Sequence, residues 1–409
     1  MFSSRFTFSL TTNRLSEVLE RKRANRERVL DLTESNPTRA GFAYEEAEIS
    51  AALAQPQALL YEPEPRGLLS ARKAVAEYYR ARSEHVEAQH VHLTASTSEG
   101  YAYLFKLLAN PGDEVLVPQP AYPLLDFLTA LESVRLIHYP LRYEERLGWQ
   151  IDFAKLAACV STQTVAIVVV NPNNPTGSFI KQKELQQLNA LCAEHSLALI
   201  SDEVFLDYSE GENALRVSSL VGNREALTFV LSGLSKISAL PQVKLGWIHV
   251  SGPEALRAEA QERLDFIADT YLSVSTPAQH AAQRLLALRH HMQKQIQQRC
   301  RENERYLREQ CARAPECRVL KREGGWSAIM AIAKEFSEEE FTVSLLEEDD
   351  VLVHPGYFFD FPQSGYLVAS LLTPQTVFQE GIARMMKRLS NKAITGSTRE
   401  PRMGANERE

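Results

Sequence analysis

Two lysines lie eight residues apart in the stretch SGLSKISALPQVKLGW, among small and apolar residues. Lys236 comes soon after the apolar run LTFVL, and Lys244 comes just before LGW. A lysine seldom lies in an apolar setting without an ionic partner or a chemical task. A neutral lysine amine attacks carbonyl carbons and moves protons, and a charged one binds anions. The stretch therefore predicts a chemical role for at least one of the two lysines.

Polar side chains follow four strand-like apolar runs along the chain. In open α/β sheets, ligands bind just beyond the carboxyl ends of the strands. Each group alone has a simpler explanation as a helix cap, a turn, a tight loop or a lysine that reaches solvent. Their order along the chain instead predicts one polar site at one edge of a sheet. The side chains concerned are Ser96, Thr97, Ser98, Asn174, Asp202 and Lys236.

Apolar runs that alternate with helical segments predict the elements that position this site. They indicate an α/β fold with a mostly parallel, seven-stranded sheet sandwiched between helices. Strands are expected over 91–94, 114–118, 134–139, 164–170, 197–201, 227–232 and 244–250. Helices are expected over 13–28, 70–82, 98–109, 121–132 and 181–195.

The character of the chain changes after residue 289, where a long polar helix leads into short strand-like runs. We therefore expect a large domain over residues 44–289 and a smaller α+β domain. The smaller domain is expected to combine an N-terminal segment, 1–43, with a C-terminal segment, 290–390. Residues 391–409 are polar and without periodicity, and are predicted to be disordered.

Composition excludes several classes of protein. The 409 residues are 44% hydrophobic and 24% charged, as in ordinary globular proteins. The net charge of -7 argues against a nucleic-acid partner. No apolar run approaches the roughly 18 residues that span a membrane. The five cysteines form no CxxC pair, so we expect free thiols, no metal site and a cytoplasmic location.

From about Leu32 to Leu389 the chain resembles the class I/II aminotransferases, which are pyridoxal 5'-phosphate enzymes of fold type I. The matching stretches are SNPT, YEPEPRG, ASTSEG, PGDEVLVPQPAYP, NPNNPTG, SDEV, LSK and VHPGYFF. The combination of NPNNPTG, SDEV and LSK at these spacings is the specific part of the match. The resemblance implies an aspartate-aminotransferase-like fold, a pyridoxal-phosphate cofactor and a homodimer.

The resemblance also implies roles for individual side chains. Lys236 would form a Schiff base with the cofactor aldehyde and then move the substrate's Cα proton. Asp202 would keep the ring nitrogen of the cofactor protonated, which makes the ring an electron sink. Asn174 would donate to the 3'-oxygen of the ring, and the Asn174–Pro175 bond is expected to be cis. Tyr122 would stack on the ring face; the alternative is a core aromatic in the run AYPLLDF.

A phosphate site is implied at a helix N-terminus, where free N–H groups and the helix dipole favour an anion. One of its members, Tyr61, would reach the phosphate from the neighbouring subunit. The residues implied around the phosphate end are Ser96, Thr97, Ser98, Ser235, Lys244 and Tyr61.

Three positions depart from the pattern of the family. Lys244 replaces an arginine that usually grips the phosphate; lysine keeps the charge but loses the planar fork, and it could also simply point to solvent. Phe205 replaces a tyrosine that donates to the ring oxygen. Val368, in LVAS, replaces the arginine that binds the substrate α-carboxylate.

The loss of this arginine leaves the binding of a substrate carboxylate open. Three other residues are candidates by their position in the sequence: Asn36 and Arg39, in and just after SNPT, and Arg66, just after the segment of Tyr61. A surface position is an equally good explanation of both arginines. The preferred amino donor could also lack an α-carboxylate.

The leading function is therefore transfer of an amino group from a small amino acid or amine to a keto acid. A β-eliminating lyase, such as a C–S lyase, uses the same scaffold and stays an alternative. A transcriptional regulator is disfavoured, because the region before Leu32 holds one predicted helix and no helix-turn-helix.

Overall fold

A computed structural model gives the structure of residues 2–6, 13–333 and 337–397. Within them, an eight-stranded sheet has the strand order β2-β9-β8-β7-β6-β3-β4-β5. Its inner pairings from β4 to β8 are parallel, whereas β9 and β5 run antiparallel to their neighbours. The strands are β2 (Val91–Thr94), β3 (Glu114–Gln119), β4 (Arg135–Glu144), β5 (Gly148–Ile151), β6 (Thr164–Val170), β7 (Ala198–Asp202), β8 (Thr228–Gly233) and β9 (Gly246–Ser251).

The expected α/β fold is confirmed, with one strand more than the seven expected. The additional strand is β5, which pairs only with β4 at the edge of the sheet. The expected strand over 244–250 begins only at Gly246, because Lys244 has a left-handed backbone with φ of 59°.

Alternating side chains of the central strands face two separate cores. In β6, Ala166 and Val168 pack with α4, α5 and α9, whereas Ile167 and Val169 pack with α3, α7 and α10. Successive residues of a strand point to opposite faces, so continuous apolar runs must be covered on both sides. The covering helices are α3 (Leu69–Arg80), α4 (Thr97–Leu108), α5 (Leu124–Leu131), α7 (Gln182–His195), α9 (Glu254–Tyr271) and α10 (Thr276–Ala287).

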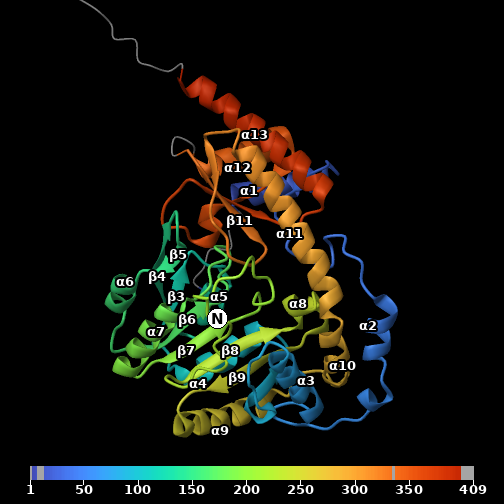
Figure 1. Cartoon of the computed structure of the whole chain (residues 1–409), viewed down its shortest axis with the longest axis vertical. Coiled ribbons are helices and arrows are strands. Elements are labelled where there is room, and N and C mark those ends of the chain that lie inside the picture. Colours follow the sequence, from blue (N-terminus) through green and yellow to red (C-terminus); the bar gives the residue numbers. More distant parts are fainter. Residues whose placement is uncertain (1, 7–12, 334–336, 398–409) are drawn as a thin grey trace, which may run out of the picture.

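A second body lies above the sheet in Figure 1 and contains α11, α12, α13 and the sheet β10-β11-β14-β13. The N-terminal segment joins it, because β1 (Leu30–Asp31) pairs in parallel with β12 (Val351–Leu352). Its other elements are β10 (Cys317–Val319), β11 (Ser327–Ile332), β13 (His354–Pro355), β14 (Tyr366–Ser370), α1 (Arg14–Ala24), α11 (Arg289–Cys311), α12 (Glu338–Asp349) and α13 (Gln375–Ser397).

The remaining short helices lie in the connections between these elements. They are α2 (Glu46–Leu53), α6 (Phe153–Ala158), α8 (Leu234–Ile237), η1 (Pro56–Leu59), η2 (Ala88–His90), η3 (Pro241–Val243) and η4 (Gly356–Phe359). Across the described ranges, no helix combines the length and the apolar character needed to cross a membrane. The exact domain boundaries given above stay a prediction.

Several expected boundaries are wrong. The first helix ends at Ala24 rather than at residue 28, and the helix expected over 121–132 begins at Leu124, after Pro123. Proline lacks the N–H that a helix interior needs, so it favours the start of a helix. The predicted disorder from residue 391 is wrong for 391–397, which belong to α13. Residues 398–409 lie outside the described part of the chain.

Candidate functional site

A cavity of about 310 Å³ lies beyond the carboxyl ends of the parallel strands. β6, β7 and β8 end there in Val170, Asp202 and Gly233, which all line it. Trp326 and Ser327 close the cavity from the second body. The parallel strands thus bring polar residues from distant parts of the sequence to one edge of the sheet, as the pattern of the sequence predicts.

Lys236 is placed in this cavity by a tight junction between β8 and α8. The N–H of Leu234 donates to the carbonyl of Leu245 at 2.9 Å. A Cβ atom on Gly233 would lie 2.9 Å from the Cα of Gly246, so the close approach of the two strands requires glycine here. This junction fixes the backbone from which the Lys236 side chain enters the cavity.

Aromatic rings surround the Lys236 amine. Its Nζ lies 5.2 Å from the ring centroid of Trp326 and 5.6 Å from that of Phe205. Burial in these surroundings lowers the pKa of the Lys236 amine, and the nearby Asp202 carboxylate opposes the shift. A lowered pKa increases the neutral fraction of the amine, which is the nucleophilic form.

Asp202 lies at the end of β7 and faces the same cavity. Its Oδ2 accepts from the Tyr101 hydroxyl and its Oδ1 accepts from the N–H of Val204, both at 3.1 Å. Burial raises the pKa of the Asp202 carboxyl to about 6, although both hydrogen bonds and Lys236 oppose the shift. A buried carboxylate of this kind gains most from a ligand that brings a positively charged N–H.

Asn174 lines the cavity between the two bodies. Its Oδ1 accepts from the Ser327 hydroxyl at 3.2 Å, which leaves its amide N–H groups for a ligand. The Asn174–Pro175 peptide bond is cis, as expected, and the Asn171–Pro172 and Gln119–Pro120 bonds are cis as well.

The start of α4 forms one end of the cavity, with Ser96, Thr97 and Ser98 in its lining. Ser96 is the N-cap, and its Oγ accepts from the N–H of Glu99 at 3.2 Å. The capping role of Ser96 and its place in the cavity therefore coexist. A helix N-terminus with free N–H groups and hydroxyls favours a phosphate or another anion.

Lys244 and Ser235 also line the cavity. The left-handed backbone of Lys244 follows η3, and the residue is exposed. An exposed ammonium group at this place adds positive charge to the lining of the cavity.

The two tyrosines named in the sequence analysis lie in different places. Tyr122 lines the cavity with 53% of its surface exposed, and its ring centroid lies 6.5 Å from that of Phe359. It is therefore not a core aromatic. Tyr61 is 69% exposed and is not among the residues that line the cavity of this single chain.

The structure does not bring the three candidate substrate residues to the cavity lining. Arg66 binds Asp265 with two hydrogen bonds of 2.6 and 2.5 Å, so its guanidinium is already occupied. Arg39 is exposed, and Asn36 accepts from the N–H and hydroxyl of Thr38. For all three, a structural or surface role describes their position in this chain better than a substrate contact does.

Sequence reasoning missed several residues of the site. Trp326 is only 3% exposed and lines the cavity from the start of β11, after two glycines. The GGW turn before an apolar run could have marked it. Tyr101 and Ser327, which hold Asp202 and Asn174, carry no signal in the sequence that separates them from ordinary residues of a helix and a strand.

Comparison with known proteins gives consistent results. Residues 27–379 match the family described as aminotransferase class I and II. The chain is 32% identical over 273 residues to the glutamate-pyruvate aminotransferase AlaA of Escherichia coli K12, covering 65% of this chain and 66% of that protein. It is 29% identical over 390 residues to an alanine aminotransferase of Mycobacterium bovis, covering 92% of this chain and 88% of the relative.

Solved structures show the same fold over nearly the whole chain. An aminotransferase from Escherichia coli matches with a TM-score of 0.84 at 26% identity, covering 95% of this chain and 98% of that one. An alanine aminotransferase from Pyrococcus furiosus also matches with a TM-score of 0.84, at 25% identity, covering 96% of this chain and 100% of the other.

Proposed function

Because the chain belongs to the class I and II aminotransferase family, we propose that it transfers amino groups with pyridoxal 5'-phosphate held on Lys236. The observation that carries this proposal is the cavity itself. It combines a lysine amine with lowered pKa, a buried carboxyl group and a helix N-terminus within one space.

The residues present fit this cofactor. The start of α4 and Lys244 suit its phosphate, Asp202 suits a protonated ring nitrogen, and the amide of Asn174 suits the ring oxygen. When bound, the cofactor supplies an electron sink for the carbanion that forms at the Cα of the amino substrate.

The chain's own residues would then position groups and move protons. The Lys236 amine, partly buried and flanked by two rings, would hold the cofactor and afterwards carry the Cα proton. Asp202 would keep its charge against the ring nitrogen, with Tyr101 and Val204 fixing its carboxylate. Trp326 would shield the reacting atoms from water.

Transfer is favoured over elimination, because the relatives named above are aminotransferases. The two reactions differ in their products. Incubation with L-alanine and 2-oxoglutarate should give pyruvate and glutamate, and incubation with L-cysteine should give no sulfide. Release of ammonia and sulfide without transfer to a keto acid would instead support the C–S lyase alternative.

We also propose a homodimer in the cytoplasm. Leu59, Leu60 and Tyr61 form an exposed run with 92%, 61% and 69% of their surfaces accessible. A run of this kind suits a subunit contact better than contact with solvent, and would let Tyr61 approach the partner's phosphate site. The five cysteines are free, as expected for a reducing compartment.

Phe205→Tyr tests the environment of the ring oxygen. Phe205 is 8% exposed and lies near Lys236, so a hydroxyl added to its ring would enter the cavity. A hydrogen bond to the charged oxygen contributes about 1.5–3 kcal/mol, so the spectroscopic pKa of the cofactor-loaded protein should fall by about 1–2 units. Absorbance titration measures it, and Phe358→Tyr outside the cavity is the matched control. Superimposable titration curves for Phe205→Tyr and wild type would place Phe205 away from the ring oxygen.

The cavity offers no arginine for a substrate carboxylate. Among the described residues that line it, the cations are Lys236 and Lys244, and both have proposed roles toward the cofactor. Val368 is 2% exposed and lies on the same face of β14 as Ser370, two residues later, which does line the cavity. We therefore propose that this chain selects its amino donor without an arginine–carboxylate pair of its own.

Val368→Arg tests this proposal. Its side chain should extend along the face of Ser370 toward the cavity and bind a carboxylate there. We expect kcat/KM for L-alanine to rise at least about 10-fold, with no rise for ethylamine, which lacks the carboxylate. Arg39→Ala and Arg66→Ala should leave the ratio of kcat/KM for the two donors unchanged. Two results would contradict the proposal. One is an unchanged ratio of kcat/KM for L-alanine to kcat/KM for ethylamine in Val368→Arg. The other is a loss of activity with L-alanine in Arg39→Ala or Arg66→Ala.

A further inference from the structure

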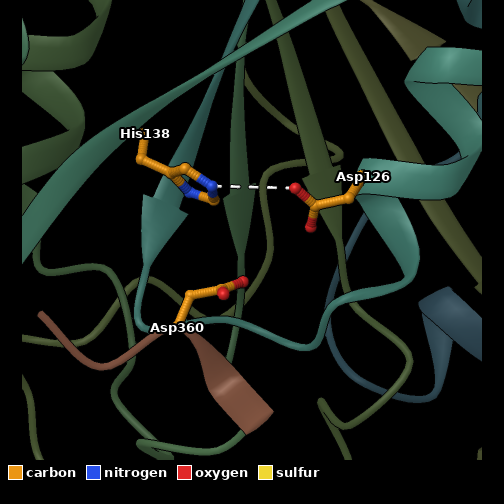
Figure 2. A group of neighbouring side chains, drawn as sticks. All are labelled: Asp126, His138 and Asp360. Atoms are coloured by element: carbon orange, nitrogen blue, oxygen red, sulfur yellow. Dashed lines mark ion pairs between the residues drawn. The ribbon is translucent and has the colours of Figure 1, made fainter. Parts of the chain in front are cut away.

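Three potential metal ligands meet beside the cavity, on three separate elements (Figure 2). Asp126 belongs to α5, His138 to β4, and Asp360 directly follows η4. One ligand atom from each lies within 4.8 Å of the others, and His138 Nε2 is 3.8 Å from Asp126 Oδ1. The group thus joins one imidazole and two carboxylates from positions up to 234 residues apart in the sequence.

The two carboxylates lack ordinary partners. Throughout the described residues, no hydrogen bond reaches the side-chain oxygens of Asp126 or Asp360, and the contact of Asp126 with His138 is too long to be one. Two facing carboxylates without a donor would gain from a cation placed between them.

His138 is suited to complete such a site. Its Nδ1 is buried and has no partner among the described residues, whereas its Nε2 points toward Asp126. Nε2 is therefore the nitrogen available to a ligand. The separation of 3.8 Å is too long for a hydrogen bond but close to the distance of about 3.4 Å between neighbouring ligands of a tetrahedral zinc ion.

We propose that Asp126, His138 and Asp360 bind a divalent transition-metal ion, with Zn²⁺ as the best match. One imidazole nitrogen and two carboxylate oxygens suit Zn²⁺ better than Mg²⁺ or Ca²⁺, which prefer oxygen ligands alone. Water would complete the coordination, since the side chains of Asp126 and His138 are 44% and 28% exposed.

The site would tie the second body to the rim of the cavity. The N–H of Ala121 already donates to the carbonyl of Phe359 at 3.0 Å, and Tyr122, Leu124 and Leu125 line the cavity. An ion bound by Asp126 of α5 and by Asp360 would add a second link between the same two segments, next to the hydrogen bond between Ala121 and Phe359. A bound ion would therefore hold α5 and the segment after η4 together at this rim, independently of the transfer reaction.

The test is a titration of the chelator-treated, cofactor-loaded protein with Zn²⁺, followed by calorimetry and by thermal unfolding. We expect one ion per chain and a higher Tm with Zn²⁺ than with Mg²⁺. His138→Ala and Asp360→Asn should each weaken binding at least about 10-fold while the cofactor absorbance shows an intact fold. Unchanged binding in both variants, or no binding by the wild type, would overturn the proposal.

Two controls separate this site from other places that bind zinc. His195 is an exposed histidine 3.9 Å from Glu194, so His195→Ala should leave binding unchanged. Cys311 and Cys317 bring two thiols within 3.1 Å, and zinc also binds thiolates. Cys311→Ser should likewise retain the ion; loss of binding in either control but not in His138→Ala would assign the ion elsewhere and overturn the proposal.

Discussion

Lys236→Ala is expected to lower kcat for amino transfer by at least ~10⁴-fold and to leave the fold intact. The variant loses both the amine that holds the cofactor and the group that carries the Cα proton, and proton transfer alone accounts for 10²–10⁴-fold. The fold should persist because Nζ makes no hydrogen bond or ion pair among the described residues, and the rings of Phe205 and Trp326 lie near it with centroids 5.6 and 5.2 Å away.

Two further variants make this result specific. Lys236→Arg keeps a positive charge but cannot be deprotonated at neutral pH, so it should be as inactive as the alanine variant. Lys183→Ala removes an exposed lysine outside the cavity and should keep wild-type kcat. Steady-state kinetics measures all three; activity of Lys236→Ala or Lys236→Arg within 10-fold of wild type would contradict the role of Lys236.

Asp202→Asn is expected to have opposite effects on catalysis and on the stability of the cofactor-free protein. Asparagine cannot balance a protonated ring nitrogen, so kcat should fall by about 10²–10³-fold. The same change removes a carboxylate that is costly to ionise when no cofactor is bound, because burial raises its pKa from 3.8 to about 6.

The effect of Asp202 on stability has a defined dependence on pH. Between pH 3.8 and about 6 the folded chain keeps a proton on Asp202 that the unfolded chain has lost. The free energy of unfolding therefore falls as pH rises through this window, by about 3 kcal/mol in total. Asp202→Asn has no carboxyl group to ionise, so its free energy of unfolding does not fall in this way. At pH 8 it should exceed that of wild type by up to about 3 kcal/mol, and at pH 4 it should not exceed it.

Urea unfolding of both cofactor-free proteins, at equal protein concentration, measures this difference. Glu203→Gln is the matched control for activity, since Glu203 is a neighbouring buried carboxyl that accepts from Ser219 and from the N–H of Leu220 but does not line the cavity. It should keep kcat within a few-fold of wild type. Equal free energies of unfolding of Asp202→Asn and wild type at pH 8 would contradict the prediction, because ionisation of Asp202 would then cost the folded protein no stability.

The central sheet could be predicted well because its strands are buried on both faces. Runs such as Thr164–Val170 are apolar at successive positions, since alternate side chains serve two cores. β5 was not predicted, because it is a four-residue strand at the edge of the sheet with only one neighbouring strand. Its sequence, Gly-Trp-Gln-Ile, therefore needs no continuous apolar run.

The polar rim could also be predicted, since Asn174, Asp202 and Lys236 follow strands whose ends meet at one edge. Residues that tertiary packing places at the site, or removes from it, could not be predicted from the sequence. Trp326 enters the cavity from the second body, and Arg66 binds Asp265, which lies 199 residues later in the chain. The role of Tyr61 stays a prediction, because it depends on a second copy of the chain.

The proposed site requires that the cofactor is attached to Lys236 rather than to Lys244, eight residues later. Borohydride makes the link between pyridoxal phosphate and its lysine permanent, so digestion and mass spectrometry of the reduced protein identify the modified residue. We predict one pyridoxyl group per chain, on the peptide that contains Lys236. A label on Lys244 or on any other lysine, with Lys236 unmodified, would contradict the proposed site and the mechanism built on it.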